Sequence, residues 1–199
     1  EARAITNLSS GLMGLSLAKM AYTMGAEVTV ISGRSNYEFP PCIKTIKATN
    51  HYEMNKSITS NIERNDIYIS AAAISDYKPN YIKGKIKKEN ENISLELKKT
   101  KDILSYIGKN FGHKLVVGFA AESENLIENA RKKLVSKNLD IIIANEIKHT
   151  MGKSKAKMVI IDQYEDRYLP VAEKEVQSKI ILEHIFKLSS RVKDHDTIN

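Results

Sequence analysis

A loop of small residues near the start of the chain has the composition of a phosphate-binding turn. Residues 7–14 read Asn-Leu-Ser-Ser-Gly-Leu-Met-Gly and run into a stretch with apolar residues at helical spacing. The first backbone N–H groups of a helix lack partners within the helix and carry partial positive charge, so they suit an anion. As a dinucleotide fingerprint the pattern is incomplete, because Gly11 and Gly14 lack a third glycine at the proper offset. A nucleotide site is one interpretation, and a tight turn before a capped helix is the other.

Several charged side chains have spacings that suit a phosphorylated ligand. Lys133 and Lys137 are four residues apart in a predicted helix and so share one face. Their ammonium groups repel unless a phosphate or an acid lies between them, and a solvated basic face is the alternative. Lys85 lies in a lysine-rich stretch that is either a soluble loop or a flap over a triphosphate. Asp76 either holds a ribose hydroxyl or a metal, or sets a turn.

Alternating helices and strands are expected to position these residues. Apolar residues at helical spacing predict helices over 14–24, 52–63, 102–110, 125–137 and 173–188. Apolar runs predict strands over 27–31, 66–73, 114–121, 140–145 and 158–161. This alternation predicts an α/β fold with a doubly wound, mostly parallel, Rossmann-like sheet. We expect the strand at 158–161 at the sheet edge, and residues 83–99 as a protruding β-hairpin flap outside the sheet.

Ligands in such sheets bind beyond the carboxyl ends of the strands. The candidate residues follow three of the predicted strands or belong to the small-residue loop: Ser70, Ala71, Ala72, Asp76, Phe119, Glu122, Asn145, Asn7 and Ser9. We therefore expect one crevice to contain them all.

Composition narrows the function classes. The 199 residues suit one α/β domain, and a net charge of +7 points to a polyanionic partner. Aromatic residues make up 7% and Trp is absent, so no stacking platform for nucleic acid is expected. Cys42, the single cysteine, allows no internal disulfide and has no base beside it, which fits a reducing compartment and no catalytic thiol. Without a long apolar run or an export signal, we expect a cytoplasmic protein that does not bind membranes.

A set of linked motifs, in order along nearly the whole chain, resembles one enzyme family. The motifs are ITNLSSG at 5–11, AAAISDY at 71–77, KIKK at 85–88, VGFAAE at 117–122, KNLD at 137–140 and AN at 144–145. They are similar to those of the phosphopantothenate-cysteine ligase family, also called phosphopantothenoylcysteine synthetase. In bacteria this domain is usually the carboxy-terminal half of a bifunctional coenzyme A biosynthesis protein.

The resemblance implies a CTP-dependent ligase that joins 4'-phosphopantothenate to L-cysteine through an acyl-cytidylate. Asn7 matches the family asparagine associated with that intermediate, and Lys85 matches a residue that binds the triphosphate and offsets transition-state charge. These two are the implied catalytic residues. The positions that resemble the CTP site are Ser9, Ser70, Ala71, Ala72, Asp76, Lys85, Asp102, Ile103, Leu104, Ser105, Phe119, Lys133 and Lys137.

The resemblance also implies partners and limits. CTP is the implied co-substrate, although ATP versions occur, and Mg²⁺ is expected without a nameable protein ligand. A homodimer is implied, as is fusion to or association with a flavin-dependent decarboxylase; no flavin is expected in this chain. Residues 1–190 are expected to form one nucleotide-binding ligase domain that lacks the family's front strand and Gly-rich loop, and residues 191–199 a polar tail.

Two other functions stay open at this stage. An NAD(P)-dependent reductase of Rossmann type needs an acid near the end of the second strand, where this chain has Ser32, Gly33 and Arg34. The other is an inactive, truncated module for nucleotide binding or oligomerisation.

Overall fold

A mixed five-stranded sheet forms the centre of the molecule. A computed structural model describes residues 6–7, 9–80, 84, 94–146 and 155–196. The strand order is β10-β9-β7-β6-β3, with β3 (Ile67–Ser70), β6 (Leu115–Glu122) and β7 (Ile141–Glu146) parallel to one another. The α/β class is therefore confirmed.

The sheet continues past β7 with two antiparallel strands, and here one expectation was wrong. β9 (Met158–Asp162) pairs with β7 on one side and with β10 (Asp166–Tyr168) on the other, so it is an interior strand and not the edge. The short, charged β10 is held by a turn: the Asp162 carboxylate accepts hydrogen bonds from the backbone N–H groups of Tyr164 (2.7 Å) and Glu165 (2.8 Å). Its other oxygen lies 2.8 Å from the His184 ring.

Helices cover both faces of the sheet. One face carries α1 (Leu12–Thr23) and α6 (Lys174–Asp196), which pack against each other. The helix α6 is longer than the 173–188 expected and extends through Asp196. The other face carries α2 (His51–Asn61), the 3₁₀ turn η1 (Ile62–Arg64), α3 (Ile103–Asn110) and α4 (Leu126–Lys137). Side chains alternate along the strands accordingly, with Val116 in the α3/α4 core and Val117 in the α1/α6 core.

The sheet is interrupted beside β3. β1 (Thr29–Ser32) and β2 (Lys44–Lys47) form a separate parallel pair, and a cavity of about 530 Å³ is lined by residues of both β1 and β3. Every residue of β1 and β3 is only partly buried, whereas all five residues of β9 are buried. In the described residues, β1 and β3 each pair with a strand on one side only, and the two open edges line this cavity.

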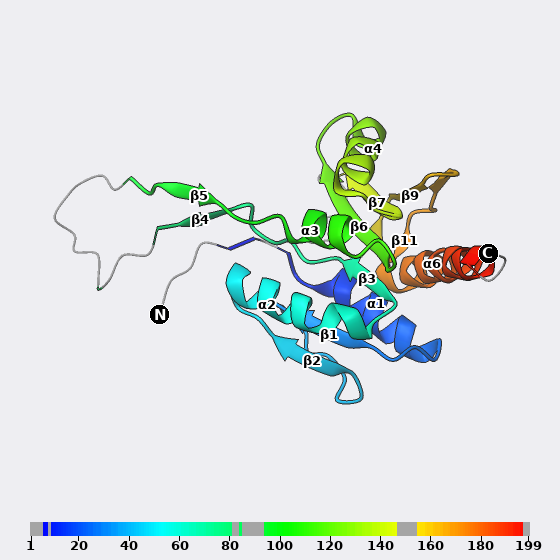
Figure 1. Cartoon of the computed structure of the whole chain (residues 1–199), viewed down its shortest axis with the longest axis horizontal. Helices are drawn as coiled ribbons and strands as arrows, with labels where there is room; N and C mark the ends of the chain where they lie inside the picture. The colour runs from blue at the N-terminus through cyan, green and yellow to red at the C-terminus, as the bar shows by residue number, and fades with distance from the viewer. Residues whose placement is uncertain (1–5, 8, 81–83, 85–93, 147–154, 197–199) are drawn as a thin grey trace.

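Two short antiparallel pairs complete the fold. β8 (Lys155–Ala156) pairs with β11 (Ala172–Glu173), just before α6. β4 (Tyr77–Pro79) pairs with β5 (Leu97–Lys99), and this hairpin projects away from the body of the molecule in Figure 1. The base of the hairpin expected outside the sheet is thus confirmed. Residues 81–83 and 85–93, which include Lys85, lie outside the described residues. No helix in the described part of the chain is both long and apolar enough to span a bilayer.

Candidate functional site

The small-residue loop and the segment after β3 meet at the carboxyl edge of the sheet. The side-chain amide of Asn7 donates a hydrogen bond to the backbone carbonyl of Ala73. Gly11 caps α1 with a φ of 83°, and a Cβ there would lie 2.4 Å from Oγ of Ser35. Only glycine therefore fits this turn, because another residue would combine a left-handed backbone with a clash. The turn directs the start of α1 toward the residues that follow β3.

A cavity of about 230 Å³ lies at this junction, on the α1/α6 face of the sheet. Four of the residues expected in the site line it: Ser9, Ala71, Ala72 and Phe119. Asn145, another candidate of the expected crevice, lines it too. Asn7, Ser9 and residues 70–72 also line the end of the larger cavity beside β3. The structure therefore brings the small-residue loop, the end of β3 and β6 together, as the sequence predicts.

The charged candidates lie on the opposite face of the sheet. Phe119 and Glu122 are three residues apart in β6 and so point to opposite sides. Phe119 packs with the α1/α6 core, while Glu122 lies 2.5 Å from the ammonium of Lys133 on α4. Lys137, one turn further along α4, lies 2.9 Å from a carboxylate oxygen of Asp102. An acid beside each ammonium was one of the explanations for the paired lysines, and the structure has this arrangement: Glu122 is the partner of Lys133, and Asp102 is the partner of Lys137.

Asp102 is the cap of α3 as well as the partner of Lys137. Its side chain accepts a hydrogen bond of 2.9 Å from the backbone N–H of Ser105. Partial burial alone would raise the pKa of Asp102, but the Ser105 hydrogen bond and the Lys137 ammonium outweigh it and hold the pKa below its ordinary value. Asp102 is therefore a carboxylate at neutral pH.

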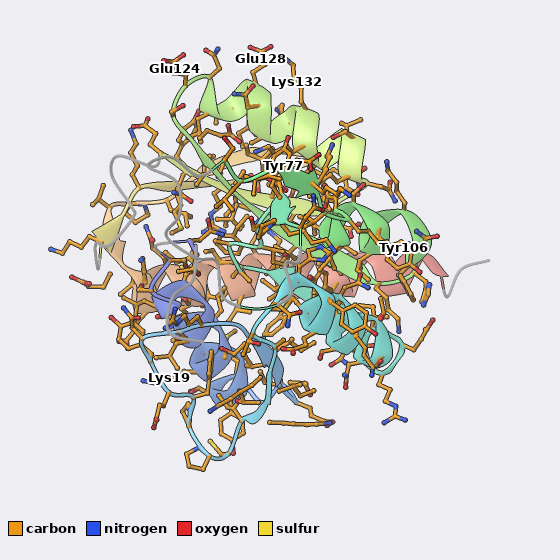
Figure 2. All side chains as sticks on the ribbon, turned by 90° about the vertical axis from the view of Figure 1, so that its left-hand side faces the viewer. Lys19, Tyr77, Tyr106, Glu124, Glu128 and Lys132 are labelled. Atoms are coloured by element: carbon orange, nitrogen blue, oxygen red, sulfur yellow. The ribbon has the colours of Figure 1, made fainter. Side chains whose placement is uncertain are left out.

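The other residues of this helix start differ in what they offer a ligand. The Ile103 side chain is 2% exposed and belongs to the core, so only the backbone of this residue could contact a ligand. Leu104 and Ser105 are partly buried. Figure 2 views the molecule from the side on which the hairpin projects, with Tyr77 near the centre, Glu124 just before α4 and Glu128 and Lys132 of α4 at the top, and Lys19 of α1 at the lower left.

The expected residues that line neither cavity are Asp76, Glu122, Asp102, Ile103, Leu104, Ser105, Lys133 and Lys137. Asp76 is exposed at the base of the hairpin, where its backbone carbonyl accepts a hydrogen bond of 2.8 Å from Thr100, and its side chain lines neither cavity. Lys85 lies outside the described residues. No group of three or more His, Cys, Asp or Glu side chains within the described ranges is placed to hold a metal. A Mg²⁺ ion that coordinates mainly phosphate oxygens needs no such cluster.

One residue at the cavity was missed by the sequence reasoning. Lys174, the first residue of α6, is 9% exposed and lines the cavity with Phe119 and Asn145. The available signal was its position at a predicted helix start, since a cation there opposes the helix dipole.

The comparisons with known proteins identify the family. Residues 1–188 match the family model described as "DNA/pantothenate metabolism flavoprotein C-terminal domain". The chain belongs to this family. The family resemblance inferred from the motifs is therefore confirmed. The residues that line the two cavities all lie within the matched range.

Individual relatives and solved structures of this family are similar to the chain over most of its length. The chain is 40% identical over 188 residues to the coenzyme A biosynthesis bifunctional protein CoaBC of Borreliella burgdorferi, covering 92% of this chain and 48% of that protein. It is similar to a crystal structure of the C-terminal domain of CoaBC, with a TM-score of 0.80, 30% identity, and coverage of 97% of this chain and 88% of that one. A Cab2 variant in complex with phosphopantothenate-cysteine shares the fold at 15% identity and a TM-score of 0.80, over 98% of this chain and 83% of that one. The chain spans about half the length of the curated relatives it matches.

Proposed function

We propose that this domain catalyses the CTP-dependent ligation of 4'-phosphopantothenate to L-cysteine in coenzyme A biosynthesis. The observation that carries the proposal is the match to this family over residues 1–188; four of the motifs, at 5–11, 71–77, 117–122 and 144–145, contribute residues to one cavity at the carboxyl edge of the sheet. The fold shared with the C-terminal domain of CoaBC supports it.

The reaction proceeds in two balanced steps. A carboxylate oxygen of 4'-phosphopantothenate attacks the α-phosphorus of CTP, the bond to the pyrophosphate group breaks, and an acyl-cytidylate and pyrophosphate form. The cysteine amine then attacks the acyl carbon, the bond to CMP breaks, and the new amide nitrogen loses a proton. Neither step needs a nucleophile from the protein, which agrees with the exposed position of Cys42 away from both cavities.

Asn7 is suited to the acyl group. One of its two amide hydrogens is used on Ala73, which fixes the side chain across the loop junction. The second amide hydrogen and the carbonyl oxygen stay available for the acyl-cytidylate. A donor fixed in this way stabilises developing charge without reorganising first.

The nucleotide is assigned to the shared edge of the sheet. The start of α1 with Ser9 offers backbone N–H groups to phosphate, and Lys85 is assigned the role of a further cation for the triphosphate. On the opposite face, Lys133 and Lys137 keep further ammonium hydrogens beyond those used on their carboxylates. Asp76 lies between the edge and the hairpin, within reach of a nucleotide that crosses the edge. Mg²⁺ would bind the phosphates and neutralise part of their charge.

The partners follow from the same assignment. The active form is a homodimer, and in the whole polypeptide the domain is joined to, or associates with, a flavin-dependent decarboxylase, since the matched relatives are named bifunctional and are about twice as long. The cavity of about 530 Å³ between β1 and β3 suits an additional strand, because an extended segment in it would pair with the open edges of both strands.

A pyrophosphate-release assay tests the function. With the protein, Mg²⁺ and CTP, we expect release only when phosphopantothenate is present, and amide product only when cysteine is added as well. Replacement of CTP by ATP measures the nucleotide preference. Binding of NADPH but not CTP in a thermal-shift series would instead support a reductase, and a response to no nucleotide would support an inert module. The whole polypeptide is assayed in parallel, so that a dependence on other segments is visible.

A further inference from the structure

The cavity on the α1/α6 face has the electrostatic character of an anion site. Of the described residues that line it, Lys174 is the one with a charged side chain, and the others are small, apolar or uncharged polar residues. No carboxylate from the described residues borders the cavity. An anion that enters therefore meets no like charge from these walls.

Lys174 is an unpaired ammonium in this wall. The residue is 9% exposed, and no hydrogen bond or ion pair of its ammonium is found among the described residues; only its backbone carbonyl is engaged, by Ser178 at 2.7 Å. Lys174 is one of the residues that line the cavity. Burial lowers the pKa of the Lys174 ammonium, and no charged group in the described part of the chain is found to counter that shift. A buried cation without a partner is costly and is usually kept for a ligand.

Two helix starts reinforce the positive potential at the same place. Lys174 is the first residue of α6, where the helix dipole already contributes positive charge. Its neighbour Glu175 is directed outward to Lys19, at 3.8 Å, and is 72% exposed. The start of α1 lies across the cavity, with Gly11, Leu12 and Met13 in its wall and no side-chain cap on Gly11. The Leu12 N–H donates a long hydrogen bond of 3.4 Å to Oγ of Ser10, so the start of α1 and Lys174 border one small space from two sides.

We propose that Lys174 binds a phosphoryl group of a substrate in this cavity, together with the backbone N–H groups at the start of α1. This inference rests on the proposed ligase function for the identity of the ligand, since both CTP and 4'-phosphopantothenate carry phosphoryl groups. The ammonium acts as a binding group for the anion and takes no part in covalent steps.

Calorimetric titration of Lys174→Met tests the proposal, with Lys179→Met as the matched control. Methionine keeps the length and apolar stem of Lys174 and removes the charge. Lys179 lies on the same helix, but its side chain is 61% exposed and 4.0 Å from Glu183. CTP, 4'-phosphopantothenate and inorganic pyrophosphate are titrated separately into each protein, and the unfolding midpoint is measured without ligand.

We expect Lys174→Met to weaken pyrophosphate binding by about 10- to 100-fold, the range for a hydrogen bond to a charged group. The same loss is expected for whichever substrate places its phosphoryl group in the cavity, so the CTP and phosphopantothenate arms identify the source. Lys179→Met should change each affinity less than about twofold. Without ligand, Lys174→Met should unfold at the same or a higher temperature than the wild type, because it removes an uncompensated buried charge.

The outcomes separate the two proposals. Wild-type affinity of Lys174→Met for all three ligands, with ligation intact, overturns the anion site and leaves the ligase function standing. A Lys174-dependent affinity for pyrophosphate without any ligation by the whole polypeptide sustains the anion site and refutes the function. A wild-type chain that binds none of the three ligands, or a Lys174→Met protein that unfolds at a clearly lower temperature, also overturns the anion site.

Discussion

Gly108 on α3 lies against the end of α4. Replacing a helical glycine by alanine usually stabilises a protein, but Gly108→Ala should destabilise this one. A Cβ at this position would lie 2.2 Å from the carbonyl oxygen of Lys137 and 2.5 Å from that of Asn138. Both contacts are with backbone, which no side-chain rotation can relieve. The carbonyl of Gly108 also accepts a hydrogen bond of 2.6 Å from the Asn138 amide. The substitution therefore pushes the end of α4 away from α3.

The expected magnitude follows from three contributions. Overpacking against fixed backbone costs about 1–3 kcal/mol, and loss of the Asn138 hydrogen bond costs about 1 kcal/mol. The better helix propensity of alanine returns up to about 1 kcal/mol. We expect a net loss of about 2 kcal/mol, which lowers the unfolding midpoint by about 4–8 °C in a chain of this size.

Chemical and thermal unfolding, followed by far-UV circular dichroism, measure this loss. Gly14→Ala is the matched control, because Gly14 also lies in a helix but nothing lies within 4 Å of a Cβ there. That variant should be unchanged or more stable by up to about 1 kcal/mol. If Gly108→Ala is as stable as the control, the close approach of the two helices is wrong, and so is the placement of Lys137 that depends on it.

Three further predictions concern the reaction and the β9–β10 turn. Lys85→Ala should abolish pyrophosphate release with an unchanged unfolding midpoint, whereas Lys98→Ala in the same hairpin should stay active; activity in the first variant would remove the role of Lys85. Asn7→Ala should let the acyl-cytidylate accumulate in quenched reactions analysed by mass spectrometry, and normal turnover without the intermediate would contradict this. Asp162→Asn should cost about 3 kcal/mol of stability at neutral pH, because it removes the carboxylate 2.8 Å from the buried His184 and leaves only Glu165, at 3.9 Å, as an acid beside that ring among the described residues. Burial raises the pKa of Asp162, but its hydrogen bonds outweigh burial and hold the pKa in the folded protein below its ordinary value. The stability that the Asp162 carboxylate contributes is therefore fully present above the pKa of the unfolded state and is lost as the pH falls through the pKa of the folded state. The gap between wild type and variant should therefore narrow in acid, and a gap that stays constant with pH refutes this account.

The periodic elements of the fold were predictable because their patterns are local. The helix expected over 125–137 is observed as Leu126–Lys137, and the strand expected over 140–145 is observed as Ile141–Glu146. β2 and β10 were missed because they are short and polar, and pairing rather than composition forms them. β10 depends on the Asp162 carboxylate, which holds the turn between two chain segments. Such a contact has no counterpart in hydropathy.

The candidate site was predictable at the level of the sheet edge but not at the level of its two faces. The expectation of one crevice placed Phe119 and Glu122 together because both follow the same predicted strand. The odd spacing of Phe119 and Glu122 already contained the separation, since residues three apart in a strand face opposite ways. What the sequence did not contain is which helix covers each face, and that decides which lysines have acids for partners.

This separation bears on where the negative charge of a triphosphate can lie. On the α3/α4 face, Lys133 and Lys137 are each within 3 Å of a carboxylate, so an incoming phosphate would have to displace or share Glu122 or Asp102. On the α1/α6 face, the described wall has one cation, no acid and the starts of two helices. The cost of anion entry is therefore lower on the α1/α6 face. A nucleotide that crosses the edge would then place its phosphates toward Lys174 and its less charged part toward α4, where carboxylates and ammonium groups in pairs suit hydroxyl and amino groups better than phosphate.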